Sequence, residues 1–118
     1  AKLWEDYPQC IDALVHMGYM NFNFSRSLRN AENCHRVAIH IAEKLVPPGL
    51  DGIFLWSELN NRPYLRALHG LCLVTWRLGN FAEAEHVARK MLRLNPPDNQ
   101  GARFLIEQIM QGEPWTED

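Results

Sequence analysis

The sequence YLRALHGLCLVTWRLGNFAEAEHVARKMLRLNPP, residues 64–97, predicts two amphipathic helices joined by a short turn. Its apolar and small side chains recur at i, i+3, i+4 and i+7, the spacing that gathers side chains on one helix face. Gly79 marks the expected reversal of the chain, because glycine adopts the left-handed conformation that commonly ends a helix. Pro96 and Pro97 stop the second helix, because proline lacks an amide hydrogen and clashes with the preceding turn. The predicted core faces are Leu68, Leu71, Cys72 and Thr75 in the first helix and Phe81, Ala84, Val87, Ala88, Met91 and Leu94 in the second.

Three features of this stretch resemble the tetratricopeptide repeat (TPR). Small residues, Cys72 and Ala84, stand where the two helices would cross closely, an LGxF turn occupies residues 78–81, and LxLNP closes the unit at 92–96. The resemblance covers about one period of roughly 34 residues. It implies an all-α, TPR-like stack of antiparallel helical hairpins, in which the first helix of a repeat lines a groove for a peptide or partner helix.

A wider resemblance joins three runs of sequence. They are NNRPYLRALHGL (60–71), WRLG (76–79) and MLRLNPPDNQGARFL (91–105). Together they are similar to a module of uncharacterised bacterial TPR-like proteins with the pattern RPYxRA…LG…LRLNPxDNQGxR. That resemblance implies a fold and no particular reaction.

Helical patterns on both sides of the quoted stretch predict one domain over residues 1–118, a length that supports a single core. Aligning the Pro47-Pro48 pair with Pro96-Pro97 makes the first hairpin a degenerate copy of the second, at a period of about 49 residues. The expected parts are a degenerate hairpin at 8–48, an insertion at 49–61, a regular TPR unit at 62–97 and a capping helix at 98–112.

Turn signals set the expected helix ends. Residues 21–24 predict a turn, and Ser25 or Ser27 is a suitable N-cap for the helix that follows. Asp98 is the expected N-cap of the capping helix, and Gly112 is its expected end.

The charge balance argues against nucleic acid and anionic membranes as partners. The chain carries 12 Lys and Arg against 14 Asp and Glu, a net charge of −2, whereas both of those partners favour a strong positive excess. No apolar run approaches the roughly 20 residues that span a bilayer, and no signal peptide is recognisable. We therefore expect a cytoplasmic protein.

The sequence offers little for catalysis or metal binding. Cys10, Cys34 and Cys72 are odd in number and widely spaced, which predicts small core residues in a reducing compartment. His35 and His40 are separated by i, i+5, whereas helical zinc pairs use i, i+4 or i, i+3. We find no nucleophile beside a base and no phosphate-binding glycine loop. The expectation is a non-enzymatic protein with no metal and no cofactor.

The leading candidate site is a second, exposed stripe on the helix 64–78. Guanidinium groups beside an aromatic ring suit a carboxylate or another aromatic group. The alternative is that the stripe packs on the insertion, the first hairpin or a second subunit. The stripe consists of Arg66, His69, Leu73, Trp76 and Arg77.

Arg62 and Arg103 form a separate candidate for anion binding near a helix N-terminus, unless Arg103 instead forms a salt bridge with Asp98.

We therefore expect an adaptor that binds a peptide or partner protein through the helix 64–78 face. Because about two and a half repeats bury little surface alone, a homodimer is also expected. One alternative is a structural oligomerisation module of a larger protein with no ligand of its own. The other is a small enzyme or a sensor of an anion or ligand.

Overall fold

The computed structural model describes residues 8–25, 27–45 and 61–115 of the chain. All regular secondary structure in these ranges is helical, which confirms the all-α prediction for this part of the chain. Apart from its last residue, the predicted insertion at 49–61 lies outside the described residues. The elements are α2 (Pro8–Met20), the π-helical turn η1 (Asn21–Ser25), α3 (Leu28–Leu45), α4 (Arg62–Arg77), α5 (Phe81–Leu94) and α6 (Ala102–Met110).

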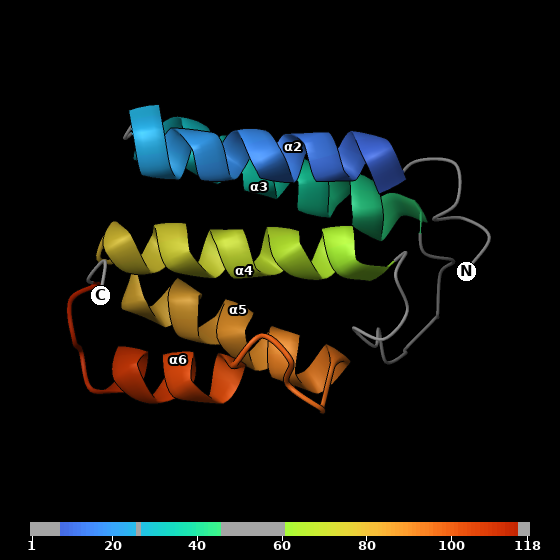
Figure 1. Ribbon diagram of the computed structural model, residues 1–118. Coiled ribbons are helices and arrows are strands. Elements are labelled where there is room, and N and C mark those ends of the chain that lie inside the picture. Colours follow the sequence, from blue (N-terminus) through green and yellow to red (C-terminus); the bar gives the residue numbers. More distant parts are fainter. Residues whose placement is uncertain (1–7, 26, 46–60, 116–118) are drawn as a thin grey trace.

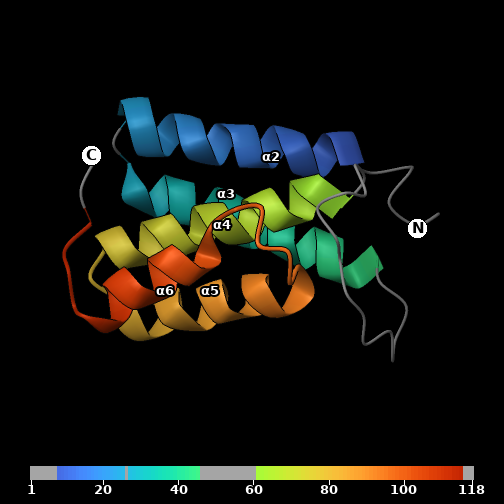
Figure 2. The ribbon, with the colours of Figure 1, turned by 60° about the horizontal axis from the view of Figure 1, so that its bottom comes forward.

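Consecutive helices run antiparallel and pack against one another in chain order (Figures 1 and 2). Helix α4 is the central element, because it contacts α2, α3 and α5. Most of its residues are buried as a result. Among the helices described, none combines the length and the hydrophobicity needed to cross a lipid bilayer.

The reversal between α4 and α5 occurs at Gly79, as predicted. Gly79 has a φ of 85°, in the left-handed region. Its amide donates to the Trp76 carbonyl at 2.9 Å, and the Asn80 amide donates to the Thr75 carbonyl at 2.8 Å, which together form a Schellman motif. The Asn80 side chain then caps α5 by accepting a hydrogen bond from the Glu83 amide.

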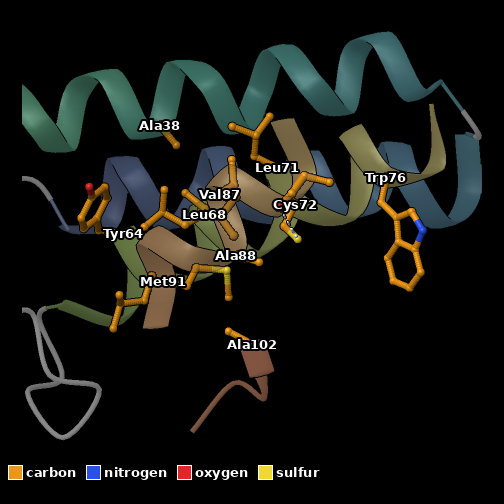
Figure 3. Close-up of a cluster of buried hydrophobic side chains, with 14 of the residues drawn as sticks. Ala38, Tyr64, Leu68, Leu71, Cys72, Trp76, Val87, Ala88, Met91 and Ala102 are labelled. Atoms are coloured by element: carbon orange, nitrogen blue, oxygen red, sulfur yellow. Dashed lines mark hydrogen bonds between the residues drawn. The ribbon is translucent and has the colours of Figure 1, made fainter. Parts of the chain in front are cut away.

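The main core lies between α4 and its neighbours (Figure 3). The predicted core face of α4 is confirmed, since all four of its residues are buried. Cys72 and Ala84 are both fully buried, and the Cys72 thiol lies 3.5 Å from the Ala84 carbonyl. The buried Thr75 hydroxyl donates to the Leu71 carbonyl within its own helix, so its burial leaves no unpaired polar group.

Two expectations about the first hairpin need correction. Cys10 is exposed and Cys34 is half-buried, so only Cys72 is a fully buried core residue. The turn expected at 21–24 is a π-helical turn that extends to residue 25. The buried face of α3 lies one position away from Cys34 and consists of Ala31, His35, Ala38 and Ala42.

The start of α6 uses Asp98 differently from the prediction. Gly101 is the N-cap residue, and Asp98 precedes it with a positive φ of 60°. The Asp98 carboxylate still performs the capping role, because it accepts hydrogen bonds from the Ala102 and Arg103 amides at 2.6 and 3.1 Å. A side chain three residues before the N-cap thus satisfies two of the free amides of α6.

Candidate functional site

The N-terminal part of the predicted stripe faces α2. Arg66 Nη1 lies 3.5 Å from Asp12 Oδ1, and both side chains remain substantially exposed. Between the two helices is an open cavity of about 570 Å³. Its lining mixes a carboxylate, an imidazole, a phenol ring, small apolar side chains and a guanidinium: Asp12, Ala13, Val15, His16, Tyr19 and Arg66.

His69 turns inward from this cavity and is tied to α2. Its Nδ1 lies 2.9 Å from the Tyr19 hydroxyl, which is also 3.3 Å from the Arg66 carbonyl. Burial raises the pKa of Tyr19 and lowers the pKa of His69, so both groups are neutral near pH 7. The pair therefore fixes the distance between α2 and α4 without carrying charge.

The C-terminal part of the stripe is covered by a segment that follows α6. Trp76, predicted to be exposed, is 6% exposed, because residues 113–115 lie over it. Its Nε1–H donates a 2.7 Å hydrogen bond to the Glu113 carbonyl. The Arg77 guanidinium stacks on Trp115, with its central carbon 4.6 Å from the ring centroid. The prediction that this face is exposed is wrong at Trp76.

Leu73 lies between the two ends of the stripe. It is half-buried and packs against both the main core and a small second cluster that contains Phe22 and Val74. Leu73 also lines a second cavity, of about 430 Å³, that lies between α4, α6 and residues 113–115. The five stripe residues therefore do not form one exposed patch. They are divided between two separate surfaces, one that faces α2 and one that lies under residues 113–115.

The arginines expected to bind an anion have other surroundings. The first amides of α6 already donate to the Asp98 carboxylate, so they are not available to an external anion. The Arg103 guanidinium points toward the Pro96 carbonyl, at 3.5 Å. Arg62 is half-buried at the start of α4, next to the N-cap residue Asn61.

The residues that sequence reasoning missed are those that complete the two surfaces. Asp12, His16 and Tyr19 follow one another at i, i+4 and i+7, so helical spacing could have placed them on one face of α2. Phe22 and Trp115 are distant in sequence and carry no such signal. Within the described residues, no group of three or more His, Cys, Asp or Glu side chains could hold a metal ion.

Comparisons of the chain with protein-family models, with curated proteins and with solved structures found no match. Any functional assignment therefore depends on the geometry described above.

Proposed function

We propose that the chain is a non-enzymatic adaptor module that binds a peptide segment of a partner protein along the α2–α4 face. In this proposal the helices form a TPR-like stack, with α2–α3 and α4–α5 as the two hairpins and α6 as the cap. The first helices of the hairpins, α2 and α4, then line the binding face. The antiparallel order of the helices and the direct contact between α2 and α4 support this arrangement (Figure 1).

The observation that carries the proposal is the cavity of about 570 Å³ between α2 and α4. Its lining includes Val15 and the Tyr19 ring, which suit an apolar side chain. At its edge, the Arg66 guanidinium and the Asp12 carboxylate form an exposed ion pair, with Nη1 and Oδ1 3.5 Å apart. An acceptor beside a donor complements the N–H and C=O groups of a peptide backbone. The cavity thus fits a short peptide with one apolar side chain better than it fits a small anion.

In this proposal the Tyr19–His69 pair has a structural role. Tyr19 and His69 are hydrogen-bonded to each other, and burial keeps both neutral near pH 7. The Tyr19 hydroxyl and the His69 imidazole are directed at each other, so in this proposal they hold α2 and α4 together. The His16 imidazole and the Asp12 carboxylate line the cavity and are assigned to binding rather than to catalysis.

A peptide-display library selected on the full-length chain tests the proposal. We expect enriched peptides whose Kd, measured by fluorescence anisotropy, rises at least tenfold in Arg66→Ala. Arg89→Ala is the matched control, because Arg89 is an exposed arginine whose ion pair with Glu85 lies within α5. Selection of no peptide, or equal binding by both variants, would count against the α2–α4 face.

A second candidate function, self-association, is favoured by exposed apolar side chains on α2 and α6. Met17 and Met20 on α2 and Phe104 and Met110 on α6 are all exposed. Of the helices that the structure describes, these two are the first and the last in the packing order, so contact between them in different copies would be head-to-tail. Light scattering over a range of concentrations tests this idea, since Phe104→Glu would lower the mass of any such assembly.

A further inference from the structure

Residues 113–115 reach α4 because α6 ends in a sharp turn. Gly112 has a φ of 71°. Its amide donates to the Ile109 carbonyl at 3.0 Å, and the Glu113 amide donates to the Gln108 carbonyl at 3.2 Å. This Schellman motif directs the chain away from the helix axis. In Figure 1 the segment after α6 runs past the ends of α5 and α4.

Among the described residues, one hydrogen bond from α4 and the ring of Trp115 hold the segment in place. The Trp76 indole donates to the Glu113 backbone carbonyl at 2.7 Å, a contact that any residue at that position would make. The rings of Trp115 and Phe22 form a T-shaped pair, with centroids 5.1 Å apart and planes at 89°. The Arg77 guanidinium lies near both rings, 5.0 Å from Phe22 and 4.6 Å from Trp115. These contacts recognise a backbone carbonyl followed, two residues later, by an aromatic side chain.

The residue between them is a proline. Pro114 is exposed and lines the cavity of about 430 Å³ beneath the segment. Its ring restricts φ, which reduces the entropy lost when the carbonyl and the aromatic ring are placed together. The occupied surface therefore matches a short Pro-aromatic sequence rather than a helix.

The contacts of this segment are those of a bound peptide rather than of a buried core strand. Glu113 and Pro114 are exposed, and Trp115 is half-buried. Cation–π, edge-on aromatic and single hydrogen-bond contacts are individually weak. Their combination is effective here because a tethered segment has an effective concentration on the order of millimolar. An untethered peptide with the same contacts competes poorly until the tethered ring is removed.

We propose that the surface formed by Phe22, Leu73, Trp76 and Arg77 recognises a Pro-aromatic segment of a partner peptide, and that residues 113–115 occupy this surface within the chain. The inference rests on the proposed function, since it places a second recognition point on the same helix α4. A partner that extends from the α2–α4 cavity along α4 meets this segment and must displace Trp115. Residues 113–115 therefore restrict which partners bind.

The test uses a fluorescein-labelled synthetic peptide of residues 110–118, MQGEPWTED, and the full-length chain. We expect the Trp115→Ala chain to bind this peptide at least tenfold more tightly than the wild-type chain does. A peptide with the tryptophan replaced by alanine should not bind, and Trp115→Ala/Arg77→Ala should lose the gain. Phe104→Ala is the matched control, because it removes an exposed aromatic ring from α6.

Denaturation of each variant establishes that it is folded. If Trp115→Ala is unstable, Trp115→Leu retains an apolar side chain beside Phe22 while removing the ring from Arg77. Equal peptide affinity of a folded Trp115 variant and of the wild-type chain would overturn the inference. That result leaves the Arg66-dependent library peptides unaffected, so failure here is distinguishable from failure of the proposed function.

Discussion

The imidazole ring of His35 packs directly against Gly70 of α4, at a place where any side chain on the glycine would overlap the ring. Gly18 of α2 lies on the same ring, and a Cβ built there would be 2.5 Å from Nε2. His35 is fully buried, and neither of its ring nitrogens has a hydrogen-bond partner among the described residues. A flat side chain from α3 thus sets the approach of α2 and α4, the two helices that form the proposed binding face.

Gly70→Ala should destabilise the protein. Alanine gains about 1 kcal/mol of helix propensity over glycine, but overpacking of a tight core costs about 1–3 kcal/mol. Because the clash is with a ring held from two sides, we expect the packing cost to be the larger effect. Urea unfolding measures the change. The double variant Gly70→Ala/His35→Ala should lose less stability than the sum of the losses in the two single variants. Strictly additive losses would show that the two residues do not interact.

Acid should destabilise the protein through His35. Burial, with a smaller contribution from the nearby His69, lowers the pKa of His35 from 6.5 to about 4. The unfolded chain therefore binds this proton more readily, so the stability contribution is complete above about pH 6.5 and is lost as the pH falls toward 4. The difference between these pKa values corresponds to about 3 kcal/mol.

The measurement is the urea midpoint between pH 8 and pH 4 for the wild-type chain and for His35→Leu. Two other titratable side chains, Tyr19 and His69, also lie close to the His35 ring. The lowered pKa of His69 acts in the same direction as that of His35 and remains in the variant. We expect a smaller loss between pH 6.5 and pH 4 in His35→Leu. Parallel curves for the two proteins would contradict the assignment.

Tyr64→Phe should cost about 1.5 kcal/mol, the value typical of a hydrogen bond to a charged group. The Tyr64 side chain is buried, and its hydroxyl donates to the Glu43 carboxylate at 2.7 Å. Burial opposes ionisation of Glu43, but Lys90 and Tyr64 more than offset it and hold the pKa of Glu43 below its usual value. Thermal unfolding checks the loss, and in a Glu43→Ala background the same substitution should have a much smaller effect.

Gly79→Ala should cost about 1 kcal/mol for a different reason. A Cβ at Gly79 would meet no atom within 4 Å, so no steric clash arises. The cost comes from the backbone alone, because a φ of 85° is unfavourable for residues with a side chain. Asn tolerates the left-handed region better than Ala, so Gly79→Asn should be closer to the wild type in chemical denaturation. Equal stability of all three proteins would refute this account of the turn.

The periodicity of residues 64–97 was sufficient to predict α4, α5 and the turn between them. A spacing of 3.6 residues states which side chains share a helix face, and Leu68, Leu71 and Cys72 are buried together as expected. Gly79 identified the turn because few other residues adopt its backbone conformation readily. These are local properties of the chain, so the sequence carries them directly.

The second face of α4 was decided only by tertiary structure. Helical spacing grouped Trp76 with Arg66, but it does not state which other segment covers either residue. Trp76 is buried under residues 113–115, whereas Arg66 borders an open cavity with α2. In the sequence, His35 stood out only as one of two histidines whose i, i+5 spacing does not suit a metal. In the structure it fills the contact between α2 and α4, because Gly18 and Gly70 leave room for its ring. Such contacts join residues far apart in the chain, so they depend on how the helices pack and not on any local pattern.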